Sequence, residues 1–96
     1  MVFGNTLCNT CGKMSNTINK TELFNLVRKA NGLRGRQVIT EYWSDGGDDW
    51  IFGSNAKGGY GEHLTYHYAT DKDLLKDIAP EYTSITQIGF NTWELK

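Results

Sequence analysis

Apolar residues recur with two different periods along this chain, and the change of period divides it into predicted helices and strands. Within 20–32 and again within 71–79 the apolar residues fall on one side of a helix of 3.6 residues per turn. We therefore predict an amphipathic helix in each range. The two stripes consist of Leu23, Leu26, Val27 and Ala30 in the first helix, and Leu74, Leu75 and Ile78 in the second.

Signals at the ends of these segments support both helices. Asn19 with Glu22 three residues later resembles a capping box, although Asn replaces the usual Ser or Thr. Gly32 is a natural stop for the first helix. Thr70 should cap the second helix, and Pro80 should end it by excluding the preceding residue from helical geometry.

The period shortens to about two in the remaining segments, which is typical of strands. We predict strands at 37–43, 49–53, 63–68 and 86–95, with a hairpin turn of glycine and aspartate between the first two. In the first strand, Val38, Thr40 and Tyr42 should share one face, and Ile39, Glu41 and Trp43 the other. In the third, Leu64, Tyr66 and Tyr68 alternate with His63, Thr65 and His67.

These elements predict an α+β fold. It would have one antiparallel sheet of about four strands, with helices 20–32 and 71–79 packed on one side. The length of 96 residues favours a single domain, 1–96, with a modest core. Residues 1–18 carry the weakest pattern.

Composition narrows the class of protein. Aromatic residues make up 12% of the chain, more than a disordered tail would contain. No run of about 18 apolar residues and no signal peptide is visible, so we expect a cytoplasmic protein with no membrane contact and with reduced cysteines. The aromatic content also permits a homodimer.

The net charge of −1 conceals an asymmetry. Residues 1–36 hold six basic residues and one acid, whereas residues 37–96 hold four basic residues and ten acids. Either half could contact a partner of opposite charge, or the two halves could lie together and neutralise each other. The basic charge of the first half, with Tyr42 and Trp43 nearby for stacking, indicates a candidate surface for single-stranded nucleic acid. Its residues would be Arg28, Lys29, Arg34 and Arg36.

The sharpest chemical signal is a Cys8-x-x-Cys11 pair followed much later by His63 and His67. Two thiolates and two imidazoles form a typical zinc ligand set, and the cysteine pair with Gly12 resembles part of a zinc knuckle. The gap between the cysteines and the histidines is far longer than in a zinc finger. On a strand, His63 and His67 would stand about 13 Å apart, too far to share one ion.

Other chemistry has weaker support. The aspartates of 45–49 do not match a calcium loop, and the glycines of 57–61 lack the rest of a phosphate-binding loop. Cys-x-x-Cys could serve redox chemistry, but no helix is expected directly after it. No serine or cysteine stands with a histidine and an acid at a supporting spacing, so we do not expect an enzyme.

The sequence therefore favours a non-catalytic protein-binding module without a cofactor. Small inhibitors encoded by phages and mobile elements share this type: under about 100 residues, one domain and no catalytic set. The partner would be another protein, such as a nucleic-acid-handling enzyme whose groove the acidic, aromatic surface occludes. The expected contact residues are Trp43, Asp45, Asp48, Asp49, Trp50 and Tyr60. The alternative is a zinc-binding nucleic-acid-binding domain using the basic half.

Overall fold

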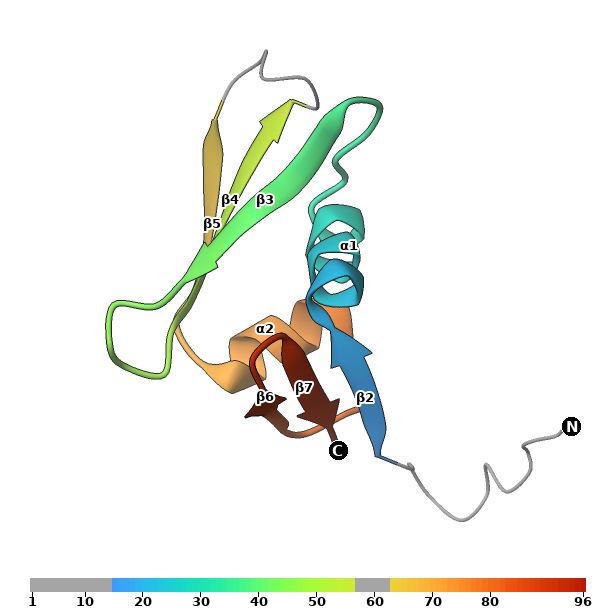
Figure 1. Ribbon diagram of the computed structural model, residues 1–96, viewed down its shortest axis with the longest axis vertical. Coiled ribbons are helices and arrows are strands. Elements are labelled where there is room, and N and C mark those ends of the chain that lie inside the picture. Colours follow the sequence, from blue (N-terminus) through green and yellow to red (C-terminus); the bar gives the residue numbers. More distant parts are fainter. Residues whose placement is uncertain (1–14, 57–62) are drawn as a thin grey trace, which may run out of the picture.

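The structure is a computed structural model that describes residues 15–56 and 63–96. It confirms the α+β class and both predicted helices (Figure 1). The elements in chain order are β2 (Asn16–Asn19), α1 (Lys20–Ala30), β3 (Gln37–Trp43), β4 (Trp50–Ala56), β5 (Leu64–Tyr68), α2 (Asp71–Ile78), β6 (Ile85–Gly89) and β7 (Thr92–Leu95).

The strands form two antiparallel sheets of three, so the prediction of a single four-stranded sheet is wrong. One sheet has the order β3-β4-β5 and the other β2-β7-β6. The predicted strand 86–95 splits into β6 and β7 because the chain turns back between Gly89 and Thr92. The Gln87 amide nitrogen donates to the carbonyls of Gly89 and Phe90, at 3.0 Å each, and closes this turn.

The helix ends follow the local signals. The Asn19 side chain accepts from the Glu22 N–H at 2.8 Å, and the Glu22 carboxylate accepts from the Asn19 N–H at 3.0 Å, which is a capping box. At the other end Gly32 has φ of +68°, and the N–H of Leu33 reaches back to the carbonyl of Arg28. This pattern is a Schellman motif, which requires the left-handed conformation that glycine adopts without strain.

A β-bulge at Thr40 changes which side chains of β3 share a face. Ile39 pairs with Ser54 and Glu41 pairs with Gly53, so two steps along β3 match one step along β4. Ile39 therefore lies on the same face as Tyr42 and is buried. The strict alternation expected for this strand is wrong, because the extra residue reverses the pattern midway.

A single cluster of buried side chains draws on both sheets and both helices. Figure 1 shows α1 against one face of β3-β4-β5 and α2 beside the ends of both sheets. The Tyr42 ring meets the Trp93 ring edge-on at 6.1 Å between centroids, which joins the first sheet to the second. The most buried large members are Trp93, Phe52, Leu23, Leu74, Leu95 and Val27.

Candidate functional site

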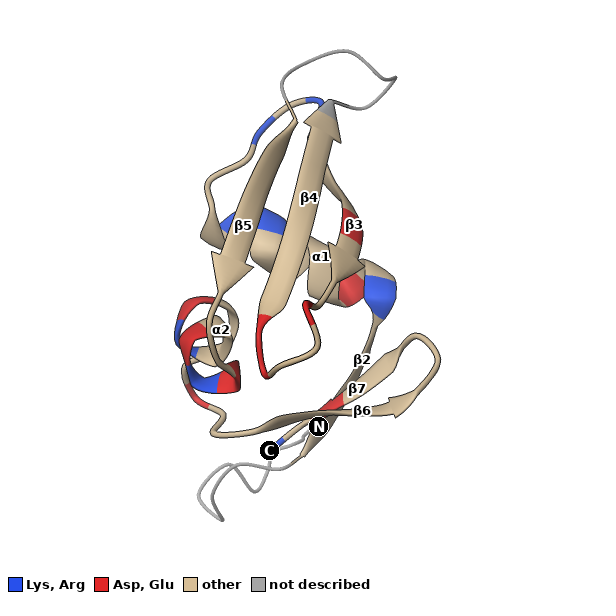
Figure 2. Cartoon of the chain, turned by 90° about the vertical axis from the view of Figure 1, so that its left-hand side faces the viewer, with Lys and Arg blue, Asp and Glu red and all other residues tan. Residues whose placement is uncertain are grey.

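The outward face of β3-β4-β5 is a mostly polar surface with one exposed aromatic residue on edge strand β3, and we call it the open face. Both helices lie on the opposite side of this sheet, and Figure 2 shows the open face toward the viewer with α1 behind it. No described element packs over it. Its side chains are Glu41, Trp43, Ile51, His63, Thr65 and His67.

Trp43 is the exposed aromatic of this face, with 38% of its surface accessible. The strand register places Ile51 between Trp43 on β3 and His67 on β5. Ile51 is only 6% exposed although it lies outside the main core cluster. Neighbouring side chains therefore cover Ile51, and Trp43 is the large apolar side chain that the open face exposes.

Beside the row formed by Trp43, Ile51 and His67, a histidine–carboxylate pair spans the sheet over Gly53. His63 Nε2 is 3.1 Å from Glu41 Oε2, and both side chains are about half exposed. Gly53 makes the close approach feasible, because a Cβ there would stand 3.0 Å from His63 Nε2 and 3.1 Å from Glu41 Oε2. No local sequence pattern displays this pair, since only the folded sheet brings residues 22 positions apart together.

A second pair lies at the other end of the face. His67 Nε2 is 3.3 Å from Asp49 Oδ2, and Asp49 Oδ1 accepts from the Ser44 hydroxyl at 2.8 Å and from the Asp45 N–H at 3.3 Å. The Ser44 hydrogen bond is the main cause of a pKa for Asp49 below its usual 3.8. Asp49 is therefore ionised at neutral pH and organises the Ser44–Asp49 segment, which we call the acidic loop.

Ser44, Asp49 and His67 are the residue types of a hydrolase triad, but the hydrogen bonds between them do not connect them in the order that a triad requires. In a triad the histidine lies between the nucleophile and the acid and takes the proton from the hydroxyl. Here the carboxylate lies between serine and histidine, and the Ser44 hydroxyl donates to Asp49. This arrangement holds a loop in place and does not activate a nucleophile.

The expected contact residues do not all share one surface. Trp43, Asp45, Asp48 and Asp49 gather where β3 meets the acidic loop. Trp50 points to the core side, is 7% exposed and donates from Nε1 to Asp71 Oδ1 at 2.6 Å. Tyr60 lies outside the described residues.

The predicted zinc ligands are not brought together in the part of the chain that is described. His63 and His67 each contact a different carboxylate, and Cys8 and Cys11 lie outside the described residues. Across residues 15–56 and 63–96, no three His, Cys, Asp or Glu side chains are placed to hold a metal ion. A zinc site that includes the cysteines stays a prediction.

In the predicted nucleic-acid surface, Arg28 has a structural role. Its Nε donates to the carbonyl of Gln37 at 2.7 Å and its Nη2 to that of Gly35 at 3.2 Å, so it braces the connector between α1 and β3. Lys29, Arg34 and Arg36 are exposed near it.

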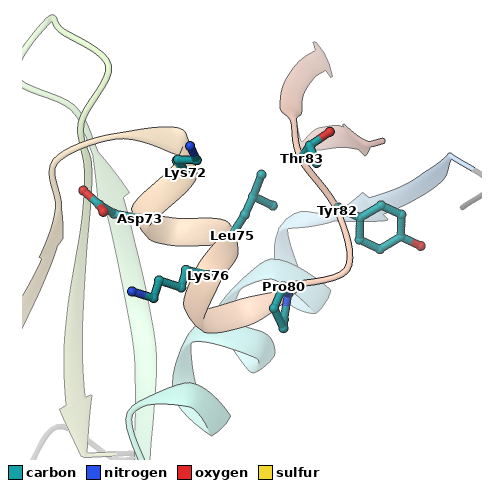
Figure 3. Close-up of a pocket in the computed structure, with 7 residues that line it drawn as sticks. All are labelled: Lys72, Asp73, Leu75, Lys76, Pro80, Tyr82 and Thr83. Carbon is teal, nitrogen blue, oxygen red and sulfur yellow. The ribbon is translucent and has the colours of Figure 1, made fainter.

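A cavity of about 410 Å³ lies against α2 and the segment that follows it (Figure 3). Its wall mixes two lysines and one aspartate with apolar surface, and it includes no histidine. No sequence motif indicated it. The lining residues are Lys72, Asp73, Leu75, Lys76, Pro80, Tyr82 and Thr83.

No protein-family model matches the chain, and no curated protein or solved structure shows a significant similarity to it. None of the helices described is both long and apolar enough to cross a membrane.

Proposed function

We propose that this chain is a non-catalytic protein-binding module whose contact surface is the open face together with the acidic loop. The observation that carries the proposal is the exposed Trp43, at the end of edge strand β3, on a face that no described element covers. Tryptophan is among the residues that contribute most to protein interfaces. The two histidine–carboxylate pairs on the same face supply polar groups around this aromatic side chain, as the rim of an interface does.

The acidic loop indicates the kind of partner. Asp45 and Asp48 are exposed, and neither carboxylate contacts a described basic group. Unneutralised charge at the edge of an interface accelerates association with a surface of opposite sign. The partner is then a protein with a basic surface, such as an enzyme that handles nucleic acid, and occlusion of its groove would make this module an inhibitor.

The test compares two exposed aromatic residues on different surfaces. The wild-type chain is used to capture partners from its native host by cross-linking, and the captured protein is purified and titrated. Trp43→Ala should weaken its binding by about thirtyfold, since hot-spot truncations cost about 2 kcal/mol. The matched control is Phe90→Ala, which removes a 90% exposed ring from the β6–β7 turn.

The control should bind like the wild type. If Phe90→Ala weakens binding and Trp43→Ala does not, the contact surface is the β6–β7 hairpin and the open face is excluded. If both variants bind the partner as tightly as the wild type does, both surfaces are excluded.

A further inference from the structure

A second cavity, of about 340 Å³, lies on the other side of the acidic loop, where the two sheets meet. The loop, the start of α2 and the adjoining ends of β3 and β4 form one part of its wall, and β6 and β7 of the second sheet form the other. Figure 2 shows acidic positions of the loop and of α2 near one another above the β6–β7 hairpin. The residues that matter for its chemistry are Tyr42, Asp48, Asp49, Trp50, Asp71 and Trp93.

The wall of this cavity is negatively charged. It contains three aspartates, and none of the residues that line it is lysine, arginine or histidine. Burial, with the nearby charges of Asp49 and Asp71, raises the pKa of Tyr42, so both carboxylates act on the same part of the cavity. The charge of the wall therefore favours a cationic ligand over an anionic one.

The wall is also aromatic. Tyr42 lies against Trp50 at 5.3 Å between ring centroids and against Trp93 at 6.1 Å. Aromatic faces attract cations, and a planar guanidinium also stacks on them. Carboxylates together with aromatic rings favour an organic cation over a hydrated inorganic one.

Trp93 adds a requirement for a hydrogen-bond acceptor. It is 2% exposed, lines the cavity, and its Nε1–H has no partner among the described residues. An unsatisfied buried donor costs about 1–3 kcal/mol. Because Nε1 is itself shielded from solvent, a ligand acceptor would relieve that cost only by displacing part of the wall beside it. A basic residue within a peptide carries both an acceptor and a positive charge.

A bare metal ion does not fit the same groups. In the described ranges no three acidic or histidine side chains converge on one point. The three aspartates are spread around the wall, which suits the several separated donors of a guanidinium.

We propose that this cavity receives an arginine side chain of the protein partner. The guanidinium would lie among the aspartates and rings, and a peptide carbonyl would accept from Trp93 Nε1. This proposal rests on the proposed function, because only a protein partner would supply the arginine. Binding to the cavity can nevertheless be tested without that partner. The volume is at the small end of the range of about 300–1,000 Å³ for ligand sites, which suits one side chain.

The probe is Nα-acetyl-L-arginine amide, titrated into the ¹⁵N-labelled chain. The three indole N–H signals, assigned with single Trp→Phe variants, report on binding. The signals of Trp93 and Trp50 should shift saturably, and that of Trp43, on the open face, should not. Nα-acetyl-L-citrulline amide keeps the shape and carbonyls without the charge, and should cause no shift at the same concentrations.

Two loop variants distinguish binding of the probe in the cavity from non-specific attraction of the probe to the acidic loop. Asp48→Asn and Asp45→Asn each remove one negative charge, but only Asp48 lines the cavity. Asp48→Asn should weaken binding of the probe by about threefold, as expected for a partly exposed ion pair. Asp45→Asn should leave the affinity unchanged.

Three results would overturn the inference: absent shifts at Trp93 and Trp50, equal shifts with the citrulline probe, or equal weakening by the two loop variants. Each leaves the proposed function standing if Trp43→Ala still reduces partner binding. Conversely, saturable arginine binding together with an inert Trp43→Ala would retain the cavity and reject the open face.

Discussion

At the residue scale, Tyr68 links the first sheet to both helices. Its hydroxyl accepts from Asn31 Nδ2 at 3.2 Å and donates to Asp77 Oδ2 at 2.9 Å, while its ring meets Phe52 edge-on. Asn31 caps α1 and Asp77 belongs to α2. Burial is the main cause that raises the pKa of Tyr68 to about 12, and Asp77 adds to it. The neutral phenol is therefore the form that the folded state stabilises.

Replacing Tyr68 by Phe should lower the free energy of unfolding by about 1–2 kcal/mol at pH 7, because two hydrogen bonds are lost. Above pH 10 the unfolded chain releases the proton that the folded chain keeps until about pH 12. Wild-type stability should thus fall between pH 10 and 12, and the variant should show a smaller fall. Urea denaturation at pH 7, 10 and 11 measures both effects.

Tyr66→Phe is the matched control for this prediction. Tyr66 lies on the same face of β5, and its hydroxyl has no hydrogen-bond partner among the described residues. Its loss should change stability at pH 7 by less than about 0.5 kcal/mol. If both variants behave alike at every pH, the link through Asn31 and Asp77 contributes nothing.

At the element scale, short-range signals predicted the helices well and the sheets poorly. The capping box at Asn19, the Schellman glycine and the Thr70 cap depend on residues within five positions, so the sequence displays them directly. The pairing of β2 with β7 joins residues about 75 positions apart, and no local pattern encodes it. The bulge at Thr40 likewise depends on the partner strand. Long-range pairing explains why one expected sheet proved to be two.

Substitution of Gly32 tests how much the fold's stability depends on the left-handed residue at the end of α1. Gly32→Ala should destabilise the fold by about 1–2 kcal/mol, the cost of this conformation for a residue with a Cβ. Open space around the position excludes a clash as the cause. Gly47→Ala is the control, because Gly47 has no positive φ and its Cβ would make only an ordinary contact with Asp49. Equal chemical denaturation midpoints for the two variants would contradict the prediction.

At the scale of the whole molecule, the candidate site combines what the sequence displays with what only the fold creates. Trp43 and the acidic loop are contiguous in the chain, so the sequence displays them together. That Trp43 lies outward while Trp50 enters the core follows from pairing of β4 with both neighbours. The cavity needs the second sheet, which supplies Trp93, and could not be predicted without it.

The shared core also implies that the two sheets unfold together. Ile18 of β2 is 4% exposed, pairs with Trp93 and belongs to the same buried cluster as Phe52 of β4. Ile18→Val should cost about 0.5–1.5 kcal/mol. If the two sheets form one cooperative unit, the mutation should lower the free energy of opening of the slowest-exchanging amides by the same amount in β4 and in β7, although it lies in only one sheet. Native-state hydrogen exchange measures this free energy.

The control for this prediction is Ile88→Val on β6, where the side chain is 54% exposed and no loss is expected. Protection lost in β7 but kept in β4 would mean that β2-β7-β6 opens as a separate unit. The cavity between the sheets would then open with it, and arginine binding there would protect the second sheet selectively. Equal losses would instead mean that a ligand in the cavity stabilises the whole chain, because it binds a site that only the intact pair of sheets forms.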